Sequence, residues 1–267
     1  MMERVVFADS WQEFFAEFGL RLFDDFFCYA YCEKVEENRR RNVVRLAFGS
    51  ESDRKVFFLK RFHHPHFKNI FFTYRNVGHF CSQAACEWHN AKLLLHNGIK
   101  TYRPVCYGEQ IKCGVERKSF LITEKLRSQC FTDFVAQNWS PLARSQKEKI
   151  LFALAKLIRR VHDLNIGMPD LFLWHIFIRE DFSSEDYQLS IIDLDRMSRN
   201  VKNRNKKVKD LGKLLWSMSP KYFDNELKDL FVCAYMGDDW MGSKAALDRR
   251  IRRRVNVISR RRKLRSY

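Results

Sequence analysis

Hydrophobic and polar positions along the chain predict strands in its first third. Apolar residues dominate residues 43–48 and 56–62, and the Gly-Ser-Glu-Ser-Asp sequence at 49–53 between them is typical of a turn. Residues 119–123 form a further strand-like run. Because short apolar runs separated by turn residues favour antiparallel pairing, the pattern predicts a small antiparallel sheet.

Three segments around these strands have weaker patterns. Residues 7–18 have the spacing of a short amphipathic helix, and residues 20–35 form an aromatic-rich run that we expect to be extended. Residues 63–80 are rich in His, Phe and basic side chains without a clear period, so we expect a loop there.

Residues 82–96 carry stronger helical signals. Ser82 is a good N-terminal cap, and Asn97-Gly98 is a typical stop signal. Glu87 lies at the edge of the apolar stripe of this helix, where a carboxylate requires a cationic partner. Lys60, on the preceding strand among apolar neighbours, is our candidate partner, although either residue taken alone is more often a surface charge.

The second half of the chain has helical periodicity. Ser140-Pro141 is a good helix start, and apolar residues then recur with a 3.6-residue period until a helix end at residues 165–167. We expect further helices at residues 209–216, at 220–235 and in the basic tail that follows.

Between these helices, two apolar runs at residues 171–178 and 187–194 flank the polar stretch 179–186. The polar stretch is rich in Ser, Asp and Glu, which are common in turns. The three segments together predict a β-hairpin.

The register of this hairpin would bring polar residues together. A turn centred near residues 183 and 184 places His175 opposite Ile192 and beside Asp193, with Asp170 at the same end. Carboxylates and an imidazole gathered in this way could supply a metal ligand and a general base, and phosphoryl transfer uses both. The simpler alternative is that the three polar residues only mark strand ends.

Composition indicates a globular protein. The 267 residues are 46% hydrophobic, which is enough for one large domain or two small lobes. No apolar run reaches the roughly 18 to 20 residues of a membrane span, and the acidic first 20 residues are unlike a secretory signal. The eight cysteines lack zinc-type spacing, so we expect reduced thiols and a cytoplasmic protein.

Positive charge is concentrated at the end of the chain. Of the net charge of +17, residues 249–267 contribute ten Lys or Arg and no acidic residue. Such a surplus attracts polyanions, including nucleic acid, anionic lipid head groups and phosphorylated glycans. Ile251, Val255 and Ile258 recur at helical spacing in this tail, so an amphipathic helix lying on a membrane surface is also possible.

The order of these elements resembles the protein-kinase-like fold, and more closely the bacterial lipopolysaccharide kinases, which phosphorylate heptose or Kdo sugars of the inner core. The resemblance covers residues 43–217 and depends on the ordered spacing of short motifs, because each motif alone is common by chance. The motifs are Phe57-Phe-Leu-Lys-Arg61, Phe67-Lys-Asn-Ile70, Ala85-Cys-Glu-Trp88, Asn97-Gly-Ile-Lys-Thr-Tyr102, Leu121-Ile-Thr-Glu-Lys125, Asp170 to Phe177 and Ile191-Ile-Asp-Leu194.

This resemblance implies an α+β, two-lobed protein-kinase-like fold. Residues 1–122 would form an N-terminal lobe with an antiparallel sheet and one main helix, followed by a hinge at 123–128. Residues 129–248 would form a mainly helical C-terminal lobe, and residues 249–267 a basic tail.

The resemblance also implies roles for single residues in binding and catalysis. Lys60, oriented by an ion pair with Glu87, would hold the α- and β-phosphates of ATP. Thr123 and Glu124 would belong to the hinge, where main-chain groups receive adenine. Asp170 would accept or orient the proton of the attacking sugar hydroxyl.

The metal site follows from the same resemblance. Asp193 would bind the Mg²⁺ that bridges the β- and γ-phosphates, and Asp210 would brace the catalytic loop. His175 stands where kinases usually have an asparagine ligand, and an imidazole is a poorer Mg²⁺ ligand than an oxygen. His175 is therefore a candidate metal ligand whose role stays open.

One kinase feature is missing, because no glycine-rich phosphate loop lies between the first two predicted strands. Arg39, Arg40 and Arg41 occupy its place. These arginines could bind phosphate or a substrate anion, or they could form a solvated hairpin tip, and both interpretations stay open.

The expected function is an ATP- and Mg²⁺-dependent kinase acting on a sugar hydroxyl of the lipopolysaccharide inner core or a related anionic glycolipid. We expect it at the inner face of the cytoplasmic membrane, held partly by the basic tail, with nucleic acid an unlikely partner. One alternative is a kinase-fold enzyme acting on a protein or small molecule. Another is an inactive kinase-like protein that binds RNA or membrane.

Overall fold

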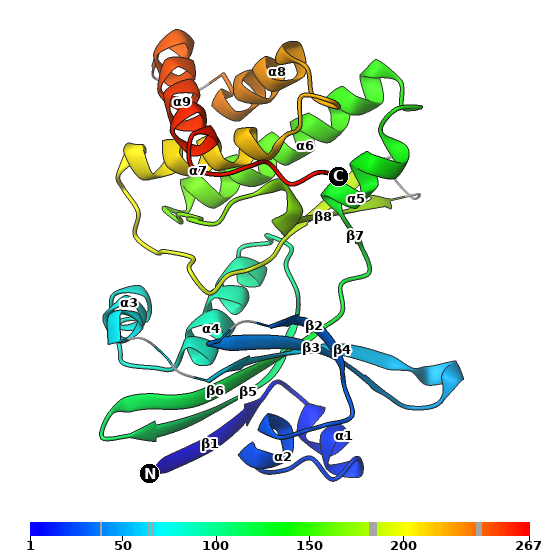
Figure 1. Ribbon diagram of the computed structural model, residues 1–267, viewed down its shortest axis with the longest axis vertical. Coiled ribbons are helices and arrows are strands. Elements are labelled where there is room, and N and C mark those ends of the chain that lie inside the picture. Colours follow the sequence, from blue (N-terminus) through cyan, green and yellow to red (C-terminus); the bar gives the residue numbers. More distant parts are fainter. Residues whose placement is uncertain (38, 64, 66, 182–185, 239–241) are drawn as a thin grey trace. The chain divides into compact units, whose positions relative to one another are not determined.

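The computed structural model describes residues 1–37, 39–63, 65, 67–181, 186–238 and 242–267. These residues form two compact units, Met1–Leu126 and Arg127–Tyr267 (Figure 1). The first unit is built around a six-stranded sheet, and the second consists mainly of helices with a three-stranded sheet.

The sheet of the first unit is antiparallel, with the strand order β1-β5-β6-β4-β3-β2. The predicted strands at residues 43–48, 56–62 and 119–123 are confirmed, as parts of β3, β4 and β6. The strands are β1 (Met2–Phe7), β2 (Glu33–Glu37), β3 (Arg41–Phe48), β4 (Lys55–Phe62), β5 (Pro104–Lys112) and β6 (Val115–Glu124).

Helices and one short 3₁₀ turn complete the first unit. The predicted helices near residues 7–18 and 82–96 are confirmed, although the structure adds a strand before the first of them. The elements are α1 (Trp11–Glu17), α2 (Phe23–Phe27), η1 (Glu51–Asp53), α3 (Phe67–Val77) and α4 (Gln83–His96).

The prediction of an extended run at residues 20–35 is wrong for its first half, where α2 forms. The Asp25 carboxylate accepts from the Leu22 amide at 2.7 Å, which caps the first turn of the helix. Phe23 and Phe26 then point into the core, where Phe26 stacks on Phe120 at 5.2 Å between ring centroids. The aromatic residues of this segment therefore pack as a short helix on the sheet.

The prediction of a loop at residues 63–80 is also wrong, because α3 occupies most of it. Thr73 and Asn76 are buried on this helix, and the Asn76 side-chain amide donates to Asn90 of α4 at 3.2 Å. Apolar residues recur at helical spacing in this segment, at positions 67, 70, 71, 74 and 77, so the sequence carried an amphipathic signal that the loop prediction overlooked.

Side chains from β5 and β6 hold the start of α4. Each of its first four amides, at residues 82–85, donates to a side chain. The acceptors, in the order of these amides, are Glu109, Glu116, Ser119 and Ser82. Three of these amides are thus bound to the sheet and the fourth to the N-terminal cap, and this holds the start of α4 against β5 and β6.

The second unit combines a small antiparallel sheet with a set of helices (Figure 1). Its strands are β7 (Gln129–Cys130), β8 (Ile176–Asp181) and β9 (Asp186–Ile191). Its helical elements are α5 (Phe131–Asn138), α6 (Arg144–Asp163), the 3₁₀ turn η2 (Leu173–His175), α7 (Arg204–Ser217), α8 (Asn225–Met236) and α9 (Lys244–Ser259).

The predicted hairpin and its register are confirmed. Ile176 pairs with Ile191, and the Ile192 amide donates to the His175 carbonyl at 2.9 Å. The turn residues 182–185 themselves lie outside the described residues.

The predicted start of the long helix at Ser140-Pro141 is wrong. α6 begins at Arg144, after Ala143, whose amide donates to the Gln146 side chain at 2.9 Å. The shorter α5, which was not predicted, precedes it, and the two are joined through a turn in which Trp139 is buried.

The helices predicted at residues 209–216 and 220–235 are confirmed as α7 and α8, and the tail forms α9. Ile251 and Ile258 of α9 are buried, and α9 packs closely on α7. A Cβ atom at Gly212 of α7 would lie 2.5 Å from Arg254 Cγ, so only glycine permits this approach.

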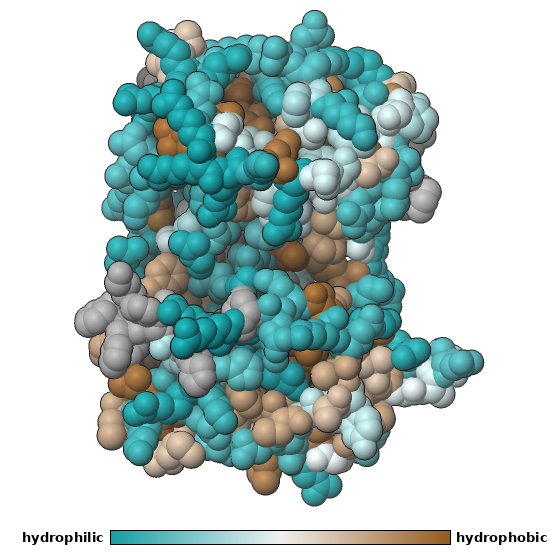
Figure 2. Space-filling model, in the orientation of Figure 1, coloured by the Kyte–Doolittle hydropathy of each residue, from teal (hydrophilic) through white to brown (hydrophobic). Residues whose placement is uncertain are grey.

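This packing overturns the hypothesis that α9 inserts its apolar stripe into a membrane surface, because the protein itself covers that stripe. On the face shown in Figure 2, the surface over α9 is largely hydrophilic. Among the described residues, no helix is long and apolar enough to cross a membrane.

Candidate active site

Lys60 and Glu87 form a buried ion pair in the first unit. Lys60 lies on β4 between β3 and β6, and its Nζ is 2.9 Å from Glu87 Oε2. The Tyr102 hydroxyl donates to Glu87 Oε1 at 2.6 Å. The Glu87 side chain is only 3% exposed, so these contacts replace the water that its carboxylate would otherwise bind.

The two predicted hinge residues end β6. Thr123 lies opposite Phe58 of β4, two positions from Lys60, and is buried. The amide of Glu124 donates to the Arg103 carbonyl at 3.0 Å. An adenine ring at this strand end would therefore have to use other main-chain groups.

The three predicted anion-binding arginines lie at the hairpin between β2 and β3. Arg39 and Arg40 are exposed, whereas Arg41 is half-buried with its guanidinium 3.6 Å from Glu36. This placement suits both phosphate binding and a solvated hairpin tip, so their role stays a prediction.

In the second unit, the Asp170 carboxylate lies between two cations that the sequence analysis missed. Arg196 Nη1 donates to Asp170 Oδ2 at 2.9 Å, and Lys213 Nζ is 3.6 Å from Oδ1. Lys213 also donates to the Pro169 carbonyl. Burial lowers the pKa of Lys213, and the nearby Arg196 adds to this effect, while Asp170 opposes it.

His175 joins Asp170 to Asp193. Its Nδ1 is 2.7 Å from the Asp170 carbonyl oxygen, which can only accept, so Nδ1 carries a proton. In the neutral ring Nε2 is then an acceptor, and it lies 3.7 Å from Asp193 Oδ2. A positive group between these two atoms, such as a metal ion, would be stabilised by both of them.

The backbone at Asp193 is unusual. Its φ of 60° lies in the left-handed region, which non-glycine residues adopt rarely and most often at functional sites. Aspartate is among the residues that tolerate this conformation best. The turn directs the carboxylate of Asp193 toward the His175 ring.

Asp210 supports the chain just before Asp170. Its Oδ2 accepts from the Met168 amide at 2.8 Å and lies 3.6 Å from His162 Nε2. Asp210 is buried. The main chain that leads to Asp170 is therefore held by a buried carboxylate on α7.

The donors present fit a magnesium ion better than a structural metal centre. Within the described residues, no group of three or more His, Cys, Asp or Glu side chains could hold a metal. Magnesium commonly takes one or two protein carboxylates and completes its shell with water and nucleotide phosphates. Asp193 could supply such a carboxylate, with His175 beside it.

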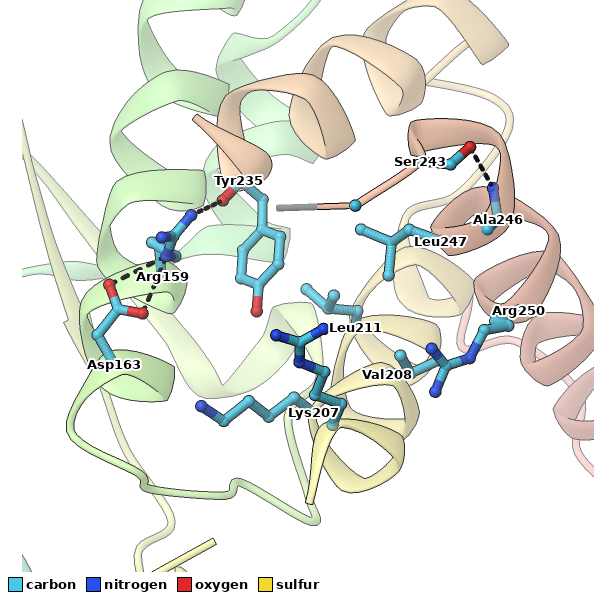
Figure 3. Close-up of a pocket in the computed structure, with 12 residues that line it drawn as sticks. Arg159, Asp163, Lys207, Val208, Leu211, Tyr235, Ser243, Ala246, Leu247 and Arg250 are labelled. Carbon is cyan, nitrogen blue, oxygen red and sulfur yellow. Dashed lines mark hydrogen bonds and ion pairs between the residues drawn. The ribbon is translucent and has the colours of Figure 1, made fainter. Parts of the chain in front are cut away.

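The second unit also contains a pocket among α6, α7, α8 and α9, which none of the predicted site residues lines (Figure 3). Two of the cations that line it, Arg159 and Lys207, bind protein acceptors. Arg159 contacts Asp163 at 2.9 Å and the Tyr235 carbonyl at 3.2 Å, and Lys207 donates to the His162 carbonyl. These contacts cap helix C-termini, which gives the charged lining a structural role.

The predicted site residues thus form two groups, one in each unit. A sheet with a lysine–glutamate pair to its main helix, followed by a helical unit with Asp170, His175 and Asp193, defines the protein-kinase-like fold. A solved structure described as "WaaP in complex with acyl carrier protein" matches this fold with a TM-score of 0.72. It is 20% identical in sequence, and the match covers 96% of this chain and 99% of the other.

The family follows from the sequence comparison. The lipopolysaccharide kinase (Kdo/WaaP) family matches residues 32–235, and the chain belongs to this family. The lipopolysaccharide core heptose(I) kinase WaaP of Escherichia coli strain K12 is 27% identical over 136 residues, which cover 49% of this chain and 51% of the relative.

A second Escherichia coli lipopolysaccharide core heptose(I) kinase WaaP is 26% identical over 162 residues, which cover 54% of this chain and 61% of the relative. The chain thus matches about half to three-fifths of the length of these curated relatives.

Proposed function

We propose that this protein is an ATP- and Mg²⁺-dependent kinase that phosphorylates a sugar hydroxyl of the lipopolysaccharide inner core, on heptose or Kdo. The observation that carries the proposal is that the family match at residues 32–235 includes both groups of site residues. The relatives named as heptose(I) kinases make heptose the first acceptor to test.

Lys60 would hold the α- and β-phosphates of ATP. Its ammonium group is already fixed by Glu87, and the Tyr102 hydroxyl in turn fixes Glu87. A cation that is oriented before the nucleotide binds neutralises phosphate charge without reorganisation during the reaction.

Asp193 would hold Mg²⁺, with His175 as a second ligand or as the group that orients Asp193. When bound, the ion would neutralise charge on the β- and γ-phosphates. The His175 ring is anchored to the main chain of Asp170. It would therefore keep the carboxylate of Asp193 at a fixed distance from residues 170–175, called here the catalytic segment.

Asp170 would take or orient the proton of the sugar hydroxyl. The hydroxyl oxygen forms the new bond to the γ-phosphorus, the bond to the bridging oxygen breaks, and ADP leaves. Arg196 covers Asp170 in the free protein, but it is 64% exposed and can turn away toward an anionic group of the substrate. Lys213 would stay beside the carboxylate and help to hold it in place.

The substrate class also suits the charge of the protein. We place the enzyme at the inner face of the cytoplasmic membrane, where the exposed cations of α9 would attract anionic glycolipid. Since the apolar stripe of α9 is buried in the protein, this attraction would be electrostatic.

The proposal is tested by measuring phosphate transfer from labelled ATP to core glycolipid in the presence of Mg²⁺. We expect Asp170→Asn to lower the transfer rate by about 10²- to 10⁴-fold, because a positioned acid or base contributes that much. Asp229→Asn, which removes a surface carboxylate paired with Arg252, is the control and should keep full activity.

Full activity of Asp170→Asn would contradict the mechanism. Failure of the unmodified protein to transfer phosphate to any core glycolipid, despite Mg²⁺-dependent ATP binding, would contradict the proposed acceptor and favour a protein or small molecule. Salt-sensitive RNA binding without ATP binding would favour the inactive alternative.

A further inference from the structure

Residues 260–267, called here the C-terminal segment, return from the end of α9 to the chain around Asp170. In Figure 1 this red segment turns away from α9 and runs back across the second unit. The Arg265 guanidinium carbon lies 4.6 Å above the Trp174 ring, and that of Arg262 lies 5.9 Å from the Phe172 ring. Both rings belong to the segment between Asp170 and His175.

The two rings form the centre of an aromatic cluster. Phe172 and Trp174 stack with ring centroids 4.6 Å apart and an interplanar angle of 12°, and Trp216 of α7 contacts both edge-on. Ile258 and Leu264 pack against this cluster. The C-terminal segment therefore covers the cluster with apolar contacts as well as with arginine.

The Tyr267 hydroxyl attaches the C-terminal segment to the second unit at another point. The Tyr267 hydroxyl accepts from the Ser219 amide at 2.8 Å and donates to the Ser217 carbonyl at 2.7 Å. Ser217 Oγ accepts from the Leu173 amide at 2.8 Å, inside the catalytic segment. Burial raises the pKa of Tyr267 to about 12, so the hydroxyl keeps its proton and remains a donor.

Phe172 and Trp174, which the C-terminal segment covers, also contact His175. Its ring lies edge-on to Phe172 and to Trp174, at 6.0 and 6.1 Å between centroids. The same ring contacts the Asp170 carbonyl and faces Asp193. Movement of Phe172 and Trp174 would therefore move the imidazole that connects the two carboxylates.

We propose that the C-terminal segment is a positioning element of the active site, which holds Phe172 and Trp174 and thereby orients His175. This inference rests on the proposed kinase function. It also sets two arginines of the exposed basic tail apart from their neighbours, because Arg262 and Arg265 lie over aromatic rings of the second unit.

The test compares Arg265→Ala and Tyr267→Phe with the control Arg261→Ala, which removes the same charge from an exposed position. We expect the first two, and more strongly their combination, to lower kcat about 10- to 100-fold with little change in the KM for ATP, since small displacements of catalytic groups cost that much. Arg265→Lys should recover part of the loss, because a lysine can also lie over the Trp174 ring.

Hydrogen exchange gives a readout that does not need activity. In the double variant, the amides of residues 171–176 should exchange faster than in the unmodified protein, while those of β4 and α4 stay unchanged. This measurement separates the present inference from the proposed function, because it holds even if the acceptor is a different molecule.

Two results would overturn the inference. One is unchanged exchange at residues 171–176 in the folded double variant. The other is an equal loss of kcat in Arg261→Ala, which would assign the effect to overall charge and not to the contacts on Phe172 and Trp174.

Discussion

Asp170 is held between Arg196 and Lys213, which come from different parts of the second unit. Asp170, Asp193 and Glu87 could be named from the sequence because ordered motifs mark their positions. The two cations could not, since nothing in the pattern separates them from the rest of the 49 Lys and Arg residues. Only the packing of α7 beside the catalytic segment identifies Lys213.

Lys213→Met tests the role of this lysine. The methionine keeps most of the buried stem but removes the ammonium group near Asp170, so we expect kcat to fall about 10- to 100-fold. This range corresponds to the roughly 1.5 to 3 kcal/mol of a hydrogen bond to a charged group. Lys209→Met, at an exposed position of the same helix, should be nearly neutral, and an equal loss there would contradict the assignment.

Single elements were predictable where their residues had one dominant pattern. The hairpin of β8 and β9 was placed in the correct register because two apolar runs flank one polar turn. α3 was missed although apolar residues recur at helical spacing along it, and α2 was missed because neighbouring aromatic residues suit a strand as well as a helix. For α2, the packing of its aromatic rings on Phe120 of the sheet decides between the two structures.

Glu116, which accepts from the Gln83 amide at the start of α4, makes the stability of the protein depend on pH. Burial raises the pKa of Glu116 from 4.5 to about 7, so the folded protein binds this proton more tightly than the unfolded chain. The contribution of Glu116 to the free energy of unfolding is therefore greatest below pH 4.5 and is lost as the pH rises through about 7. The change amounts to at most about 3 kcal/mol.

Glu116→Gln removes this dependence, because the amide can accept from Gln83 as the protonated acid does. We would measure the free energy of unfolding by denaturant at pH 5 and at pH 8. The decrease between the two pH values should be smaller in the variant than in the unmodified protein. Glu17→Gln, at an exposed position, is the control. A variant that loses as much stability as the unmodified protein would contradict the assignment.

For the whole molecule, the sequence predicted the α+β kinase-like fold from the order of its motifs, since their spacing reflects the order of the elements that carry them. The hypothesis that the apolar stripe of the tail lies in a membrane surface is wrong, because Ile251 and Ile258 are buried in the protein. The stripe at Ile251 and Ile258 looks the same whether it faces lipid or a neighbouring helix, and only the structure identifies α7 as its partner.

The remaining prediction concerns the charge of the molecule. We expect the protein to sediment with vesicles that contain anionic lipid, to be released as salt increases, and to leave purely zwitterionic vesicles unbound. Changing the exposed residues Arg249 and Arg253 to glutamate should weaken binding, at about 1 kcal/mol for each positive charge lost. Equal binding to both kinds of vesicle would instead indicate insertion of apolar residues.

The close approach of α7 and α9 at Gly212 has a consequence for substitutions in this protein. α7 supplies Asp210 and Lys213 to the candidate active site, and it receives Arg254 of α9 at Gly212. In an ordinary exposed helix, alanine in place of glycine stabilises by about 1 kcal/mol. Here the added methyl group would push α9 outward, and the C-terminal segment with it, so a better helix former would disturb the active site without touching it.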